Sequence, residues 1–340
     1  MNNDNYKKYL DSYCNLIKES FNMFNFIPEI LDDEFNVDFE DTRLLCQTRN
    51  IYFLIKYYEL FKDEESKFLA LRLYKQTKKN YFDPVQGYWK KRPSSGKLND
   101  LYEFSFLIFS FSILYKHFLL DEIKNDILFL FDEVRQDFIS KGFESIKDDS
   151  GVICQNAIMH LYEALLEYYR VTNSTSTKIE IKLLFSVIKQ KFINPETNLI
   201  AEYSKNHHET VYEPGHNYEW ASLLLESEKL GLKIETKDFC EHLVHSMENM
   251  GLSTLGFVYP KLNVSEKNAE FRIWPNLERL RYFLLTNNDS KSDTATKIIC
   301  QFYFNKCYPI EYIDSRGKAL TKKIKATTGY HLISAFKEAF

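Results

Sequence analysis

Apolar residues recur at helical spacing along nearly the whole chain of 340 residues, whereas the alternation of apolar and polar residues that marks strands is scarce. This periodicity predicts an all-α fold. Polar stretches and Gly or Pro residues divide the chain into about twelve helical segments. The predicted helices cover residues 4–24, 42–61, 64–79, 100–117, 120–140, 155–171, 177–192, 216–230, 236–249, 272–286, 291–306 and 328–339.

Every second predicted helix begins roughly 55 to 60 residues after the previous one, which is the length of a helix hairpin and its loop. Six such hairpins either pack side by side as an open solenoid or close into a ring of inner and outer helices. The period alone does not choose between these two arrangements.

Polar and aromatic residues gather at the same end of these alternate helices. The six stretches are QTRNIY from Gln47, DLYEFSF from Asp100, CQNAIMHLYEA from Cys154, EPGHNYEW from Glu213, FRIWPNLE from Phe271 and TTGYHL from Thr327. If the ring closes, these N-terminal ends converge and offer partial positive charge to an oxygen-rich ligand. The sequence therefore predicts a single domain over residues 1–340, an (α/α)6 barrel with a polar funnel.

Charge and composition argue against several classes of partner. The formal net charge is −4, the pI is near 6.1, and no long basic run offers a surface for nucleic acid or an anionic membrane. The longest apolar run, Phe104 to Tyr115, is shorter than the roughly 20 residues of a membrane span. Six cysteines without C-x-x-C spacing indicate free thiols, and the N-terminal stretch lacks a signal-peptide pattern. We expect a cytoplasmic protein and leave a homodimer open.

The EPGHNYEW stretch carries the first candidate for chemistry. His216 and Glu219 lie three residues apart, so a helix would place them on one face. A carboxylate in that position fixes the imidazole tautomer and leaves the other ring nitrogen free as a base. Tyr218 and Trp220 offer aromatic surface to a sugar ring. The alternative is a helix N-terminus in which Glu219 only caps the first turn.

A second stretch repeats this spacing. His160 and Glu163 lie three apart in QNAIMHLYEA, with Asn156 about one turn upstream. His331, at the start of the last alternate helix, is the third candidate histidine. A lone histidine in that setting is more often structural, and only the position shared with the other helix ends favours His331.

The remaining helix ends supply candidate binding groups. Arg49 can hold a carbonyl or hydroxyl oxygen with its forked guanidinium, and a structural salt bridge is an equal alternative. Glu278 can accept hydrogens from substrate hydroxyls, or it simply favours a helix N-terminus. Tyr102 and Trp274 complete the predicted substrate-binding set.

Metal and cofactor chemistry find little support. His207 and His208 lie in a polar loop, and His242 and His245 lie three apart on a predicted outer helix, where solvated histidines are usual. H-x-x-E lacks the second histidine of a zincin helix, and P-loop, dinucleotide-binding and G-x-S-x-G motifs are missing. We expect neither a metal ion nor a cofactor.

These motifs resemble those of the N-acylglucosamine 2-epimerase family, which includes mannose isomerase-like members and cellobiose 2-epimerases. The matching strings are QTRNIY, QNAIMHLYEALL, EPGHNYEW, RIWPNLERL and TTGYHL. The resemblance implies an (α/α)6 barrel that moves a proton next to the carbonyl of a ring-opened sugar.

The resemblance also implies roles for single residues. His216 and His331 would be the proton-transferring pair, and His160 would bind substrate and relay a proton. Arg49 would lie near the sugar carbonyl, and Glu219 would lie behind His216. Glu278 would bind sugar hydroxyls.

Four positions depart from the family's usual motifs: Phe104, Ile158, Asn276 and Leu277. Each removes or shortens a hydrogen-bonding side chain that the family places near the sugar, so the resemblance implies the reaction type more firmly than the substrate. Lys90, Lys91 and Arg92 are available for a sugar phosphate, although a solvated charge run is the simpler interpretation.

The stretch that ends in Tyr330 and His331 looks more like mannose isomerases than like the enzymes of N-acyl sugars. It therefore favours isomerisation of an aldose to a ketose, through a cis-enediol(ate), over 2-epimerisation of an N-acylhexosamine. A sugar-binding barrel without turnover and an α/α-barrel glycosidase stay open. Glycosidases require paired carboxylates, whereas these helix ends are led by histidines.

Overall fold

The structure is a computed structural model that describes residues 3–31, 37–143, 146, 151–204, 209–234 and 236–340. Within these residues it contains twelve α-helices. The helices are α1 (Asn3–Phe24), α2 (Leu44–Phe61), α3 (Glu64–Tyr81), α4 (Leu101–Phe118), α5 (Asp121–Val134), α6 (Gln155–Thr172), α7 (Thr175–Lys191), α8 (Pro214–Lys229), α9 (Lys237–Met250), α10 (Ile273–Leu285), α11 (Asp289–Phe302) and α12 (Thr328–Phe336).

Short elements complete the described secondary structure. Three antiparallel pairs of two-residue strands form between β1 and β2, β3 and β6, and β4 and β5. A π-helical turn, η1, extends α5. The bounds are β1 (Phe82–Asp83), β2 (Tyr88–Trp89), η1 (Arg135–Ile139), η3 (Glu266–Asn268), β3 (Phe271–Arg272), β4 (Phe304–Asn305), β5 (Tyr308–Pro309), β6 (Tyr312–Ile313) and η4 (Lys337–Ala339).

The predicted helices are confirmed, with ends that differ by a few residues. The even-numbered helices begin where the alternate helices were expected, at Leu44, Leu101, Gln155, Pro214, Ile273 and Thr328. Pro214 is the first residue of α8, where its fixed φ suits a helix and its missing N–H has no intrahelical partner to lose.

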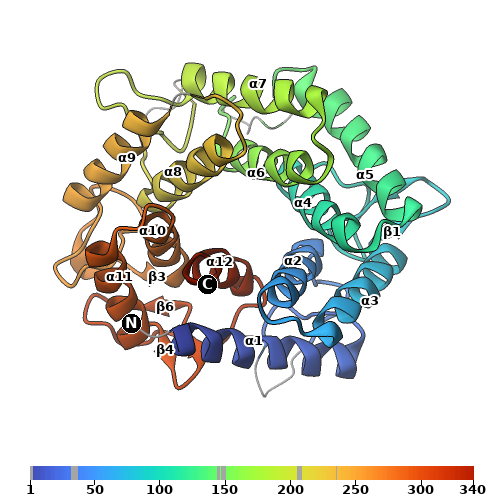
Figure 1. Ribbon diagram of the computed structural model, residues 1–340, viewed down its shortest axis with the longest axis horizontal. Helices are drawn as coiled ribbons and strands as arrows, with labels where there is room; N and C mark the ends of the chain where they lie inside the picture. The colour runs from blue at the N-terminus through green and yellow to red at the C-terminus, as the bar shows by residue number, and fades with distance from the viewer. Residues whose placement is uncertain (1–2, 32–36, 144–145, 147–150, 205–208, 235) are drawn as a thin grey trace. The chain divides into compact units, whose positions relative to one another are not determined.

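The chain divides into two compact units. The first unit comprises Cys14–Ser186 and Lys325–Tyr330, and the second comprises Met1–Tyr13, Val187–Ile324 and His331–Phe340. In the first unit α2, α4 and α6 pack in sequence, with α3 against α2 and α5 against α4 (Figure 1). In the second unit α8 packs against α10, α9 against α8 and α11 against α10. The single domain over residues 1–340 stays a prediction.

Even- and odd-numbered helices differ in how they bury side chains. In α4, every residue from Glu103 to Leu114 is buried, as expected for a helix covered on all sides. In α9 the buried residues are Cys240, Leu243, Val244 and Met247, which form one stripe at helical spacing. Each large apolar side chain so buried contributes about 1.5–3 kcal/mol, and the even-numbered helices therefore carry much of the core.

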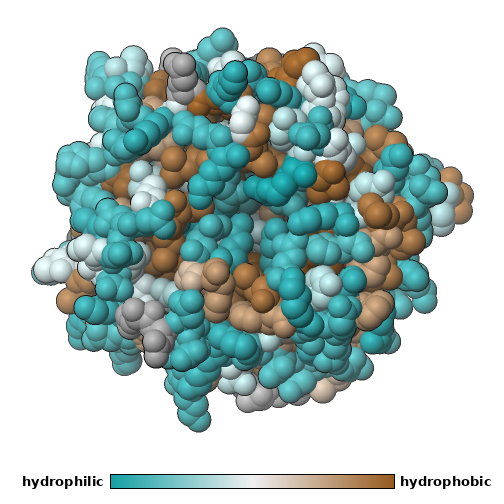
Figure 2. Space-filling model, viewed as in Figure 1, coloured by the Kyte–Doolittle hydropathy of each residue, from teal (hydrophilic) through white to brown (hydrophobic). Residues whose placement is uncertain are grey.

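Large apolar side chains that remain exposed are scattered along the chain, among them Phe68, Val85 and Leu119. The face drawn in Figure 2 shows hydrophobic residues interspersed among hydrophilic ones. Scattered apolar residues are ordinary on a protein surface. Among the described residues, no helix has the length and apolar character of a membrane span.

Candidate functional site

His216 lies in the first turn of α8, beside the indole of Trp274. Gly215 makes this approach possible, since a Cβ atom at that position would lie 2.5 Å from Cη2 of Trp274. The imidazole and indole centroids are 5.0 Å apart, and His216 is 7% exposed. The Pro-Gly pair before His216 thus starts the helix and brings Trp274 against the histidine.

Two glutamates hold the Nδ1 atom of His216. Oε2 of Glu202 lies 2.7 Å away and Oε2 of Glu213 lies 3.4 Å away. Burial disfavours the imidazolium, but the charge and hydrogen bond of Glu202 outweigh it, and the pKa of His216 rises to about 9. Glu213 and Glu219 raise the pKa of His216 further. His216 therefore carries a proton at neutral pH.

Glu202, and not Glu219, is the residue that orients His216. We expected Glu219 to accept the imidazole hydrogen because the two lie three residues apart. His216 is the third residue of α8, however, and side chains at a helix start lean toward the N-terminus. The imidazole therefore meets the loop that precedes the helix, where Glu202 lies. No local spacing in the sequence marks Glu202.

His331 has a comparable setting on α12. Its Nδ1 atom donates to Oε1 of Glu278 at 2.7 Å, and its ring centroid lies 5.4 Å from that of Trp274. His331 is 7% exposed and Glu278 is fully buried. Trp274 thus contacts both candidate histidines, and each histidine has a glutamate on Nδ1.

The contacts of Glu278 point to a role in addition to the one expected from the sequence. Oε1 accepts from His331, and Oε2 accepts from the guanidinium of Arg281 at 3.2 Å. Glu278 has 0% exposure and both its oxygens accept hydrogen bonds, so it lies where it can orient His331, and its binding of sugar hydroxyls stays a prediction. Atoms of Glu219, Glu278 and His331 lie within 4.8 Å of one another, so Glu219 contributes to the His331 surroundings as well as to those of His216.

Two groups in the second unit have the residue types of a metal site. They are Glu202, Glu213 and His216, and Glu219, Glu278 and His331. In each group the glutamate oxygen lies 2.7 Å from Nδ1. Two ligands about 2.0–2.2 Å from a tetrahedral zinc ion would lie farther apart than this, and a hydrogen bond fits the spacing. The absence of a metal stays an expectation.

The remaining histidine clusters also lack metal-site geometry among the described residues. His242 donates from Nε2 to the carbonyl of Thr197 at 2.8 Å, and His245 bonds to Asn249 at 2.9 Å. Both histidines are on the surface of α9, as expected. His207 and His208 lie outside the described residues.

The aromatic residues around His216 are placed differently from our expectation. Trp220 and Tyr218 are fully buried, and the Tyr218 hydroxyl donates to Glu248 at 2.7 Å. They pack in the core and offer no surface to a sugar ring. Trp274 is the indole that lies against the candidate histidines.

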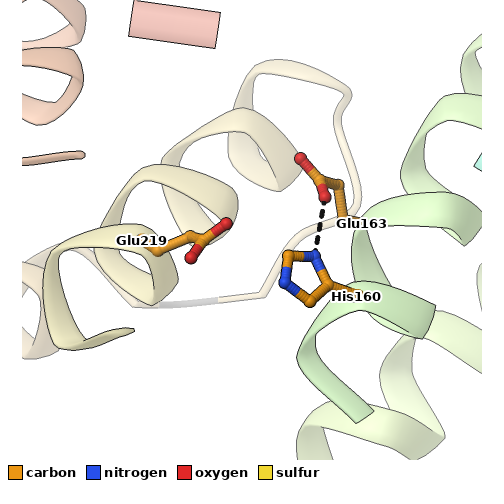
Figure 3. A group of neighbouring side chains, drawn as sticks. All are labelled: His160, Glu163 and Glu219. Carbon is orange, nitrogen blue, oxygen red and sulfur yellow. Dashed lines mark hydrogen bonds and ion pairs between the residues drawn. The ribbon is translucent and has the colours of Figure 1, made fainter. Parts of the chain in front are cut away.

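In the first unit, His160 and Glu163 form the pair that their spacing predicts. Nδ1 of His160 lies 3.1 Å from Oε2 of Glu163 (Figure 3). His160 is the sixth residue of α6, so Glu163 leans back toward it along one face. The Tyr330 hydroxyl donates to Glu163, 2.6 Å from both carboxylate oxygens. We did not single out Tyr330 from the sequence.

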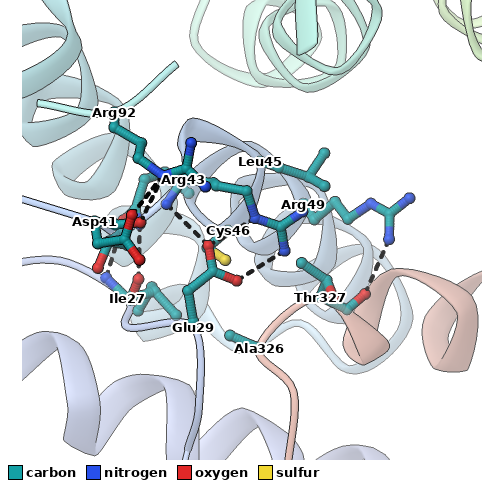
Figure 4. A network of polar contacts seen from close by, with 12 residues as sticks. Ile27, Glu29, Asp41, Arg43, Leu45, Cys46, Arg49, Arg92, Ala326 and Thr327 are labelled. Atoms are coloured by element: carbon teal, nitrogen blue, oxygen red, sulfur yellow. Dashed lines mark hydrogen bonds and ion pairs between the residues drawn. The ribbon is translucent and has the colours of Figure 1, made fainter. Parts of the chain in front are cut away.

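Arg49 is a buried cation held by aromatic rings and neutral oxygens. It is 6% exposed, and its guanidinium carbon lies 4.4 Å from the ring centroid of Phe106 and 4.7 Å from that of Tyr330. It donates to the Tyr102 hydroxyl at 2.6 Å and to the carbonyl of Thr327 at 3.5 Å. Figure 4 shows the Thr327 contact.

The salt-bridge alternative for Arg49 is not supported. No carboxylate among the described residues lies within 4.0 Å of Arg49, whereas nearby Arg43 donates to both oxygens of Glu29 (Figure 4). A buried guanidinium without a counter-charge is costly. It is therefore suited to an oxygen-rich ligand. Asn156 also offers a buried polar atom to a ligand, since its Oδ1 has no hydrogen-bond partner among the described residues.

A model of the N-acylglucosamine 2-epimerase (GlcNAc 2-epimerase) family matches residues 26–335. The chain belongs to the N-acylglucosamine 2-epimerase family. A search of curated proteins found no match.

The solved structures with a similar fold include enzymes of different activities. A cellobiose 2-epimerase from Bacillus thermoamylovorans B4167 has a TM-score of 0.85, 14% identity, and coverage of 99% of both chains. A D-mannose isomerase has a TM-score of 0.77 and 18% identity, and 98% of this chain and 97% of that chain are covered. An α-1,6-mannanase, GH76A from Salegentibacter sp. HEL1_6, has a TM-score of 0.68 and 12% identity, and 97% of this chain and 98% of that chain are covered. The predicted fold class, the all-α (α/α)6 barrel, is confirmed.

The four departures from the family's motifs are core residues. Phe104, Ile158, Asn276 and Leu277 are each 0–2% exposed. The side-chain Oδ1 of Asn276 accepts from the backbone N–H of Val258 at 3.1 Å, and its Nδ2 donates to the Tyr303 hydroxyl at 3.1 Å. These side chains fill or brace the core.

The three cations considered for a phosphate are already paired. They lie on the loop before α4, and each has an aspartate as partner. The pairs are Lys90 with Asp83 at 3.7 Å, Lys91 with Asp100 at 2.6 Å, and Arg92 with Asp41 at 2.8 Å. These ion pairs favour the simpler interpretation, a surface charge run, and the phosphate site stays untested.

Proposed function

We propose that this family member is a sugar isomerase that interconverts an aldose and a ketose, with a mannose-like sugar as substrate. The observation that carries the proposal is the arrangement of His216 and His331 on Trp274. Each imidazole has a glutamate on Nδ1, at 2.7 Å. With a hydrogen on Nδ1, each imidazole would exchange its other proton with a substrate through Nε2.

The two histidines differ in the charge that surrounds them, which suggests different roles. Glu202 and Glu213 keep His216 protonated at neutral pH, with a pKa of about 9. His216 is therefore the proton donor. Glu278 also accepts from the guanidinium of Arg281, whose positive charge opposes a second positive charge on His331. His331 is therefore the base.

The reaction follows from these two roles. Nε2 of His331 takes the proton from carbon 2 of the open-chain aldose, while His216 gives its proton to the carbonyl oxygen, and an enediol forms. His331 then returns a proton to carbon 1, and the hydroxyl on carbon 2 gives its proton back to His216. The ketose results, and both histidines regain their starting forms.

The first unit contributes proposed sugar-binding residues. Arg49 and Tyr102 are joined by a hydrogen bond of 2.6 Å and present a cation for a carbonyl or hydroxyl oxygen. His160, fixed by Glu163, and Asn156 are kept as substrate-binding groups, with His160 also a proton relay. The paired state of Lys90, Lys91 and Arg92 favours a neutral sugar over its 6-phosphate.

A 2-epimerase is the second candidate, because two separately anchored histidines also suit proton removal and return on opposite faces of carbon 2. The substrate would then be an N-acylhexosamine or related sugar. The mannanase-like alternative is weaker, because the glutamates beside His216 and His331 are engaged as hydrogen-bond partners of the imidazoles and not as a separated acid and nucleophile.

Solvent exchange distinguishes the candidates. The protein is incubated in deuterated water with mannose, glucose, N-acetylmannosamine and their 6-phosphates, and products are followed by NMR. The proposal expects a ketose with deuterium at carbon 1. Deuterium at carbon 2 with the epimer as product would instead identify a 2-epimerase. Binding of a sugar without any exchange would indicate a barrel that binds without turnover.

A further inference from the structure

A buried chain of charges leads away from His331. The guanidinium of Arg281 donates to Oε2 of Glu278 at 3.2 Å and, through its other terminal nitrogen, to Oε1 of Glu226 at 2.7 Å. Arg281 is 1% exposed and Glu226 is 9% exposed. Lys337 of η4 reaches Glu226 at 3.8 Å. Arg281 thus links Glu278 of α10 with Glu226 of α8.

Glu278 needs this cation to stay ionised. A carboxylate with 0% exposure loses its hydration, and an uncompensated buried charge takes up a proton instead. While His331 is neutral and acts as a base, its Nδ1–H offers only a dipole. Arg281 is charged at every accessible pH, so its charge offsets that of Glu278 throughout a proton-transfer cycle.

The other charged groups around Glu278 do not replace Arg281. Glu219 of α8 lies in the same group as Glu278 and His331 and adds negative charge. Glu226 is also acidic, and Lys337 contacts Glu226 and Glu338. Arg279, on the same helix, pairs with Glu248 of α9 at 2.6 and 2.9 Å.

We propose that Arg281 is a positioning residue that keeps Glu278 ionised and thereby fixes the tautomer of His331 from behind the site. The importance of this tautomer for turnover rests on the proposed function. The effect of Arg281 on the tautomer is independent of the proposed function.

The proton positions make the consequence explicit. With Glu278 ionised, Nδ1 of His331 carries the hydrogen and Nε2 has the lone pair that accepts a proton. If Glu278 were protonated, its O–H would donate to Nδ1, and the imidazole hydrogen would move to Nε2. His331 would then have no lone pair at Nε2 and would lose its function as a base.

The experiment compares Arg281→Met with Arg281→Lys and with a matched control, Arg279→Met. Arg279 is also buried, on α10 and paired with a glutamate, but it does not contact Glu278. The histidines are labelled with ¹⁵N, and the His331 signals are assigned by comparison with His331→Gln. The ¹⁵N shifts at neutral pH report the tautomer without any sugar present. The pH profiles of kcat and KM are measured on the sugar that exchanges.

We expect the Nδ1–H tautomer of His331 in the parent, in Arg281→Lys and in Arg279→Met, and the Nε2–H tautomer in Arg281→Met. We also expect kcat to fall at least about 100-fold in Arg281→Met with little change in KM, since a wrong tautomer costs up to about 10⁴-fold in serine proteases. If Arg281→Met does not fold, the double variant Arg281→Met with Glu226→Gln also removes the charge of Glu226, which would otherwise be left without Arg281. We expect the Nε2–H tautomer of His331 in this double variant as well.

Unchanged His331 shifts in folded Arg281→Met or in the double variant would overturn the inference. So would the same change of tautomer in Arg279→Met, or a change in Arg281→Lys despite its retained charge. The tautomer measurement decides the inference even if no sugar is turned over, in which case only the proposed function fails.

Discussion

Nδ1 of His216 lies 2.7 Å from Oε2 of Glu202, a residue 14 positions earlier in the chain. This contact is the main reason why the pKa of His216 is raised. It places a buried carboxylate on an imidazole that burial alone would keep neutral, and so it favours the proton donor form of His216.

Replacing Glu202 by Gln should lower the pKa of His216. Glu202 is the strongest of the groups that raise this pKa to about 9, so its charge should account for most of the rise. The alkaline limb of the pH–rate profile should move to lower pH, and an NMR titration of His216 should show the same shift. Glu213→Gln is the comparison and should give a smaller shift.

The same contact predicts how stability depends on pH. The pKa of His216 in the folded protein, about 9, exceeds the unfolded value of about 6.5. The imidazolium therefore stabilises the fold fully below about pH 6.5, and this contribution is lost as the pH rises through 9. Urea unfolding between these pH values should show a smaller loss of stability in Glu202→Gln than in the parent. An equal loss in both would contradict the assignment.

Gly215→Ala should displace Trp274 and lower activity. The added Cβ would meet the indole at 2.5 Å, so the ring must leave its present position. We expect activity to fall about 10- to 100-fold with helix content unchanged, because small misplacements in a site are costly. Gly96→Ala is the control, since a Cβ there meets nothing within 4 Å. Equal activities of the two variants would show that Trp274 does not position the histidines.

Arg49→Met should weaken sugar binding with little effect on stability. Arg49 has no carboxylate partner among the described residues, so the variant strands no buried acid, and we expect a stability change of at most about 1 kcal/mol. The KM for the sugar should rise at least about tenfold. Arg43→Met should instead lower stability and leave KM unchanged, because it removes the two hydrogen bonds of 2.8 Å that its side chain donates to Glu29. A strongly destabilised Arg49→Met with unchanged KM would indicate a structural role.

Glu103→Gln should stabilise the protein at alkaline pH. Burial, helped by Asp100, raises the pKa of Glu103 to about 8, and one of its oxygens has no partner among the described residues. Between about pH 4.3 and 8 the folded state holds a proton that the unfolded state has released, so the stability of the parent falls as the pH rises. The advantage of Glu103→Gln, measured by urea unfolding, should grow over this range. The exposed variant Glu64→Gln should show no such trend.

The helix starts were predictable because their signals are local. Pro214 and Gly215 mark the beginning of α8, and the interval between alternate helices follows from hairpin length. The His160 and Glu163 pair was predictable for the same reason, since spacing within a helix fixes which side chains meet.

The glutamate partners of His216 and His331 were not predictable, because neither lies on the same helix as its histidine. Glu202 reaches His216 from the loop before α8, and Glu278 reaches His331 across 53 positions. The position of Trp220 close to His216 predicts a contact with the sugar, but Trp220 is fully buried in the core. Such contacts depend on how α8, α10 and α12 pack, which spacing in the sequence does not encode.

The most direct test of the account measures solvent deuterium at carbons 1 and 2 of the sugar with the parent, His216→Gln and His331→Gln, together with sugar binding by each. We predict that both variants fold and bind the sugar, and that exchange falls at least about 10³-fold in each. The fall should be greater in His331→Gln, because His331 is the proposed base that takes the proton from carbon. Exchange at the parental rate in either variant would contradict the central claim that His216 and His331 carry the protons.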